Sequence, residues 1–120
     1  MPYTINGQTS RIHQEPRVEQ GQLYVQLADL VEELGGRVSW DNAQKVATAT
    51  IGQWTANIRM GNRNVDVSGT PVTLNADPIV DEDRMYVPAT FFHDAFGYSV
   101  QADQGSKQVA ISLPAGARRA

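Results

Sequence analysis

The chain has 120 residues, 41% of them hydrophobic, which allows one globular domain with a modest core or at most two very small ones. Its formal charge of −3, from 10 Lys and Arg against 13 Asp and Glu, argues against a general affinity for nucleic acids or anionic membranes. The lack of cysteine excludes disulfides and thiol chemistry, and no apolar run approaches the roughly 20 residues that a membrane span needs.

The first half of the chain predicts short strands, one helix and then a hairpin. The strands are β-branched or alternating segments bounded by turn residues, and they cover residues 3–5, 8–12, 23–25, 37–40 and 46–51. The helix follows the third strand, because apolar residues recur there with helical spacing at Leu27, Leu30, Val31 and Leu34. Gly35 ends this helix in the left-handed conformation that glycine adopts readily.

The second half predicts the same order after a bridging strand. Trp54, Ala56, Ile58 and Met60 alternate with polar residues, which indicates that the bridge is a half-buried strand. Further strands are expected at residues 65–67, 72–74, 85–87, 99–102 and 109–113. The second helix would open at Pro88, a residue suited to a first helical position, and bury Ala89, Phe92 and Phe96.

The two halves align when the sequence is shifted by 62 residues, so that residues 3–45 lie over residues 65–107 without a gap. Nine of these 43 positions are identical, and they fall on turns and apolar positions. We therefore expect two repeats that pack as one compact unit. The predicted boundaries are residues 1–51 for the first repeat, 52–64 for a bridging strand and turn, 65–113 for the second repeat and 114–120 for a flexible tail.

The predicted fold class is α+β with mainly antiparallel strands, because every connection outside the helices is of hairpin length. Each repeat would be a small antiparallel sheet wrapped around one short helix. A helix of about nine residues is not stable alone in water, so it must pack on a sheet. Repeats of this size are marginal by themselves, and we expect them to share a core or a continuous sheet.

Several motifs together resemble a known family. The second half carries Val65–Leu74, Asp77-Pro78 and Arg84–Pro88 before its helix, and the first half carries looser versions in Ile5–Gly7 and Gly21–Val25. In this order they are similar to the copper amine oxidase N-terminal domain family. The resemblance implies a small antiparallel sheet twisted round one helix, which in amine oxidases forms a stalk remote from the catalytic centre. It also implies an exported or surface-associated bacterial protein, although neither helix start has the Leu-Arg pair common in the family.

No catalytic or metal-binding constellation emerges from the sequence. His13 and His93 are 80 positions apart, whereas a copper or zinc site needs about three strong ligands. His93 is expected to be a partly covered packing residue. Asp81 and Asp83 could join another carboxylate in a hydrolase, but a solvated acidic turn is favoured. We therefore expect no catalytic residue, no cofactor and no metal.

The resulting hypothesis is a non-catalytic stalk, spacer or docking module of a bacterial cell-envelope or secreted protein. It is extracytoplasmic by family resemblance, although the chain starts without a signal-peptide pattern. The alternative is a glycan- or peptidoglycan-binding module, and the third hypothesis is a small hydrolase. A protein or cell-wall polymer could pair with an open sheet edge; no nucleic acid is expected as partner. The candidate contact residues are Trp54, Arg59, Arg63 and Tyr98.

Overall fold

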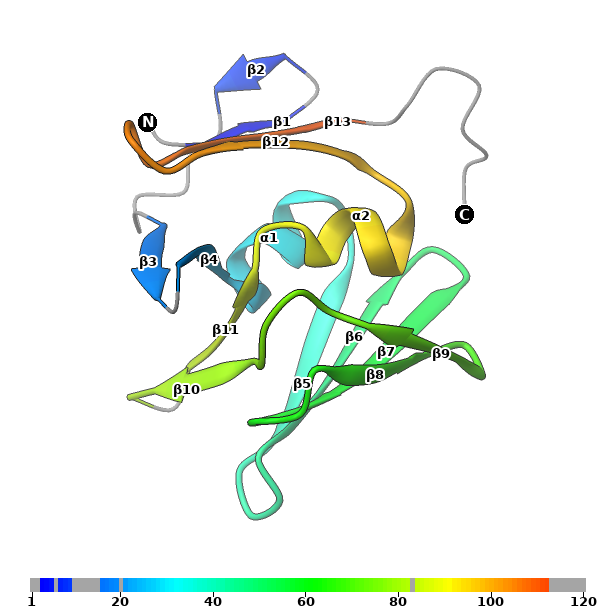
Figure 1. The fold of residues 1–120 in the computed structure, drawn as a ribbon. Helices are drawn as coiled ribbons and strands as arrows, with labels where there is room; N and C mark the ends of the chain where they lie inside the picture. The colour runs from blue at the N-terminus through cyan, green and yellow to red at the C-terminus, as the bar shows by residue number, and fades with distance from the viewer. Residues whose placement is uncertain (1–2, 6, 10–15, 20, 83, 113–120) are drawn as a thin grey trace.

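The computed structural model describes residues 3–5, 7–9, 16–19, 21–82 and 84–112 (Figure 1). Strands make up 55% of them and helices 13%, arranged as three sheets and two short helices. The fold is therefore mostly β. The expected α+β fold, in which two small antiparallel sheets each wrap one helix, is wrong. The expected tail over residues 114–120 lies outside the described residues.

The first sheet, which we call the terminal sheet, joins the two ends of the chain. Its order is β12-β13-β1-β2, with β1 at Tyr3–Ile5, β2 at Gln8–Thr9, β12 at Ser99–Asp103 and β13 at Gln108–Ser112. Strands β1 and β13 pair in parallel, with Tyr3 opposite Val109 and Ile5 opposite Ile111. The other pairs in this sheet are antiparallel. The lengths of the connections between consecutive strands do not reveal a parallel pair formed by segments far apart in the sequence.

The central sheet is antiparallel and places one strand pair of each half side by side. Its order is β10-β11-β4-β3, with β3 at Arg17–Glu19, β4 at Gln22–Gln26, β10 at Ile79–Asp81 and β11 at Arg84–Pro88. In the middle of the sheet Val25 lies opposite Val87, and both side chains are fully buried. The two halves of the chain thus meet along β4 and β11.

The third sheet has five strands and is wholly antiparallel in the order β5-β6-β7-β8-β9. Its strands are β5 at Arg37–Asp41, β6 at Val46–Ile51, β7 at Trp54–Arg59, β8 at Asn64–Val67 and β9 at Thr70–Thr73. Alternation decides which face is buried: Ala47, Ala49 and Ile51 of β6 point into the core. In β7, Ala56 and Ile58 are buried as expected, whereas Trp54 at its start is exposed, as is Met60, the residue after its end.

Two short helices lie between the terminal sheet and the five-stranded sheet (Figure 1). Helix α1, Leu27–Glu33, buries Leu27, Leu30 and Val31, three of the residues in the predicted apolar stripe. Helix α2, Phe91–Phe96, begins later than predicted. Pro88 belongs to β11, and the backbone N–H of Ala89 donates to the Leu23 carbonyl at 2.8 Å, which holds this segment on the sheet. Neither of these described helices is long and apolar enough to cross a membrane.

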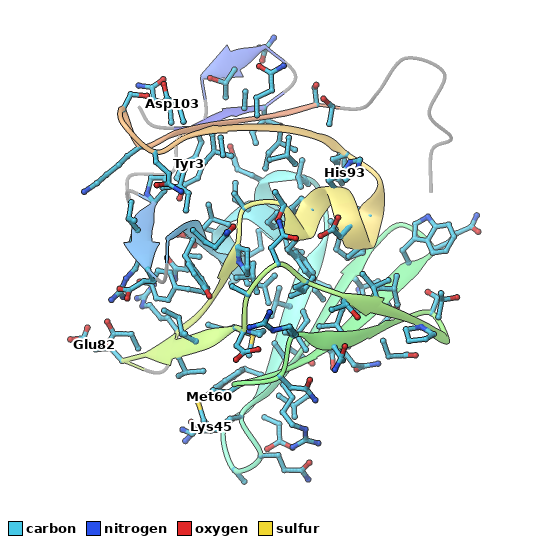
Figure 2. All side chains as sticks on the ribbon, viewed as in Figure 1. Tyr3, Lys45, Met60, Glu82, His93 and Asp103 are labelled. Atoms are coloured by element: carbon cyan, nitrogen blue, oxygen red, sulfur yellow. The ribbon has the colours of Figure 1, made fainter. Side chains whose placement is uncertain are left out.

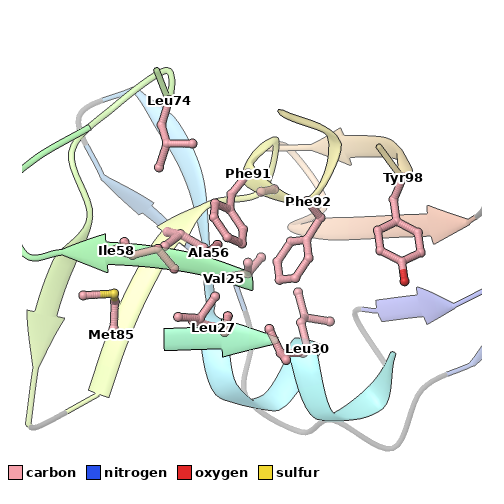
Figure 3. Close-up of a cluster of buried hydrophobic side chains, with 14 of the residues drawn as sticks. Val25, Leu27, Leu30, Ala56, Ile58, Leu74, Met85, Phe91, Phe92 and Tyr98 are labelled. Atoms are coloured by element: carbon pink, nitrogen blue, oxygen red, sulfur yellow. The ribbon is translucent and has the colours of Figure 1, made fainter. Parts of the chain in front are cut away.

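One large hydrophobic core connects all three sheets and both helices (Figure 3). Phe91 and Phe92 of α2 meet edge to face with ring centroids 5.1 Å apart, and both are fully buried. Leu30 of α1 and Val25 of β4 lie close to them in the same cluster. Strand pairing also crosses between the halves, because β1 and β2 complete the sheet of β12 and β13. The predicted arrangement, in which each half wraps its own sheet around its own helix, fails for this reason.

Candidate functional site

A hollow of about 220 Å³ opens beside α1, between this helix, β5 and β11. We call it the Trp40 pocket. Its polar lining consists of Gln26, Asp29, Glu32 and Arg84. Of these four residues the sequence pointed only to Arg84, which belongs to the family motif Arg84–Pro88; it did not indicate Gln26, Asp29, Glu32 or Trp40 as site residues.

The apolar wall of the Trp40 pocket follows from strand alternation in β5. Val38 and Trp40 are two residues apart, so they point to the same side, and both are half-buried. Trp40 lies opposite Ala47 of β6, a small residue that leaves room for the indole ring. The indole Nε1–H donates to Asn42 Oδ1 at 3.4 Å. Met85 of β11 completes this wall.

Gln26 is the one buried polar side chain among the described residues, with 4% of its surface exposed. It ends β4 and comes directly before α1. In the amide orientation that satisfies both neighbours, its nitrogen donates to Asp29 Oδ2 at 2.8 Å and its oxygen accepts from Arg84 Nη1 at 2.7 Å. A buried amide must find such partners, because an unsatisfied one costs about 1–3 kcal/mol.

The charged groups of the pocket are not neutralised by ion pairs within the part of the chain that the structure describes. Asp29 and Glu32 are three residues apart on α1 and therefore lie on the same face of the helix. Neither carboxylate contacts a cationic side chain there, and Arg84 bonds to the neutral amide of Gln26. The pocket thus carries two negative charges and one positive charge beside an apolar wall.

A second hollow lies at α2 and is lined by Asn75, Thr90, His93, Asp94 and Tyr98, among others. Asn75 Nδ2 donates to Thr90 Oγ1 at 2.9 Å, and His93 Nδ1 lies 2.9 Å from the Tyr98 carbonyl oxygen. His93 is exposed and projects from α2 (Figure 2), so the expectation of a packing residue is wrong. Burial raises the pKa of Asp94, and the neighbouring His93 partly opposes this shift.

The raised pKa of Asp94 predicts a pH dependence of stability. Because the folded state holds this proton more tightly than the unfolded state, the contribution is largest below the unfolded pKa and is lost as pH rises through the folded pKa. Asp94→Asn should therefore flatten the decrease in stability over that acidic range. Urea unfolding at a series of pH values measures it. A variant whose stability tracks the parent at every pH would contradict the assignment.

The four candidate contact residues from the sequence do not form one site. Trp54 is 39% exposed and begins β7, and Arg59 ends the same strand roughly 16 Å further on. Arg63 lies across a turn from Arg59, and its Nε donates to Asp77 Oδ1 at 3.0 Å. Tyr98 is only 8% exposed and packs in the core (Figure 3). This placement gives no support to a shared sugar-stacking surface of Trp54 and Tyr98.

The described residues among the metal and hydrolase candidates, Asp81 and His93, lie on different elements, β10 and α2. No group of three or more His, Asp and Glu side chains in the described ranges could hold a metal ion. Asp81 Oδ2 accepts from Arg17 Nη1 at 2.7 Å on the exposed side of the central sheet. His13 and Asp83 lie outside the described residues.

One signal in the sequence could have pointed to the Trp40 pocket. Gln26 follows the apolar run Leu23-Tyr24-Val25 at a position where the second half has Pro88. A polar amide at the end of a buried strand needs partners, and this requirement leads to the residues around it. Arg84 and Trp40 come from other strands, so no local pattern connects them to Gln26.

Comparison with protein-family models identifies the family of the chain. The family model of the copper amine oxidase N-terminal domain matches residues 4–111. No curated protein matches the chain significantly. Within its family this is a non-catalytic domain. Since the match runs from β1 to β13, the chain belongs to the copper amine oxidase N-terminal domain family.

Proposed function

We propose that the chain is a non-catalytic spacer and docking module of a bacterial cell-envelope or secreted protein. The observation that carries this proposal is the parallel pairing of β1 with β13. Family membership supports it, because the domain is non-catalytic in that family. The separated candidate residues support it as well, since catalysis requires groups that converge on one substrate.

The geometry of the terminal sheet suits a spacer under tension. In a parallel pair both strands run in the same direction, so sequence before Tyr3 and sequence after Ser112 continue from opposite ends of the pair. Tension between those two points shears β1 against β13 and loads all their hydrogen bonds together. The buried side chains of Tyr3, Val109 and Ile111 anchor the same pair in the core.

Force spectroscopy in two pulling directions tests this function. Because the chain has no cysteine, Ser112→Cys and Ser106→Cys provide unique attachment points, each used with a handle at the N-terminus. Pulling from Ser112 shears the β1–β13 pair, whereas pulling from the turn at Ser106 opens it one hydrogen bond at a time. We expect a clearly higher unfolding force from Ser112, since forced unfolding follows the unfolding barrier. Equal forces in the two directions would contradict a spacer under tension.

We also infer that the chain is a duplicated unit whose N-terminal hairpins are exchanged. The element order from β1 to β6 recurs from β8 to β13. Residues 62 positions apart share left-handed backbone: φ is 82° at Gly7 and 91° at Gly69, and 57° at Lys45 and 55° at Lys107. Non-glycine residues rarely adopt such angles, so the matched lysines support a common origin of the two turns.

A further inference from the structure

The Trp40 pocket holds charges of both signs at a fixed separation. The amide of Gln26 bonds to Arg84 on one side and to Asp29 on the other, and it thereby keeps the guanidinium and the carboxylate from pairing with each other. Gln26 is itself more than nine-tenths buried, so this spacer is held by the core. An arrangement of this kind presents one group for an anion and another for a cation within a single pocket.

The balance of charges selects the class of ligand. A simple anion would meet Arg84 but also the two carboxylates of Asp29 and Glu32, and a simple cation would meet Arg84. For a metal ion, the described residues provide no third carboxylate or histidine ligand at this pocket. A ligand that carries both an ammonium and a carboxylate group satisfies all three side chains.

The apolar wall adds the second requirement. Val38, Trp40 and Met85 also line the pocket, and the indole ring is half-buried. Aromatic rings favour apolar contacts, and the face of an indole also attracts a nearby ammonium group. The volume of about 220 Å³ restricts the ligand to a small molecule. We propose that the Trp40 pocket binds a free α-amino acid with an apolar side chain.

The fold does not require these side chains, because the other half builds the same elements without them. β11 ends in Pro88 where β4 ends in Gln26, and the fourth residue of β12 is Ala102 where that of β5 is Trp40. The position of Asp29, two residues into α1, corresponds to Phe91 after β11. Gln26, Asp29 and Trp40 are thus additions to the scaffold, and the proposed ligand binding is separate from the spacer function.

A tryptophan-specific titration tests this site. The chain has two tryptophans, so Trp54→Phe leaves Trp40 as the only reporter. Leucine should change its fluorescence in a saturable manner with a Kd of about 0.1–1 mM, a range typical of small ligands with few contacts. Isocaproate lacks the ammonium group and isoamylamine lacks the carboxylate, and each should bind at least about tenfold more weakly. Calorimetry on the same samples detects binding that leaves the fluorescence unchanged.

Variants at exposed positions connect the binding to the pocket. Arg84→Gln should weaken leucine binding by at least about tenfold, whereas the matched Arg59→Gln on β7 should leave it unchanged. Thermal melting verifies that both variants fold. The proposal is overturned if leucine produces no saturable change in either fluorescence or heat. It is also overturned if isocaproate binds as tightly as leucine, or if Arg84→Gln leaves leucine affinity unchanged. A response to N-acetylglucosamine and none to leucine also overturns it.

Discussion

Gly36→Ala is expected to destabilise the protein by about 3 kcal/mol, because the new methyl group has no free space. A Cβ at Gly36 would overlap the backbone oxygen of Thr50 and lie 2.7 Å from Ile51 Cγ1 and 3.0 Å from Val31 Cγ1. The Gly36 N–H also donates to the Val31 carbonyl at 2.8 Å, so the residue is held between α1 and β6. Removing this overlap requires the backbone of β6, an interior strand of the five-stranded sheet, to move.

Gly105→Ala is the matched control for this substitution. Gly105 lies in the exposed β12–β13 turn, and a Cβ there would be 3.4 Å from Asp103 Oδ1, close to ordinary contact. Both substitutions restrict the unfolded chain in the same way, so their difference isolates the effect on the folded state. Urea unfolding should show a change within about 0.5 kcal/mol for the control. Similar changes in the free energy of unfolding for the two variants would mean that the residues of α1 and β6 around Gly36 shift at little cost to accept the methyl group.

The local elements could be predicted from the sequence because their signals are local. The spacing of Leu27, Leu30 and Val31 specifies α1, and the alternation in β6 specifies its buried face. The family resemblance is confirmed by the match over residues 4–111. The start of α2 was wrong, since Pro88 suits a helix start as well as the end of a strand, and only its pairing with Tyr24 decides.

The pairing of distant strands could not be predicted from the same signals. Nothing in the composition of β1 or β13 indicates that they pair in parallel, because hydrophobic alternation fixes the buried face of a strand and not its neighbour. The Trp40 pocket was missed for a similar reason. Its side chains come from α1, β5 and β11 and from the junction at Gln26, and they meet only when these elements pack.

Cleavage between Gly61 and Asn62 is expected to give two fragments that fold only together. Fragment 1–61 lacks one of the two partner strands of β1, β4 and β7, namely β13, β11 and β8. Each fragment alone also exposes its part of the common core, and a chain of about 60 residues buries too little surface to tolerate that loss. Circular dichroism should show cooperative unfolding for the equimolar mixture and for neither fragment alone.

The centre of the interface between the fragments lies at Val25 and Val87, which face each other in the central sheet with no exposed surface. Val87→Ala in the second fragment removes buried methyl groups and should weaken association by about 2 kcal/mol, or roughly thirtyfold. Gln101→Ala, on the exposed side of β12, should leave the affinity unchanged. Independently folded repeats predict the opposite pattern, because fragment 62–120 would then unfold cooperatively by itself and Val87→Ala would act on that fragment alone. The exchange of hairpins between the halves makes mutual dependence the expected result, since each hairpin completes a sheet of the other half.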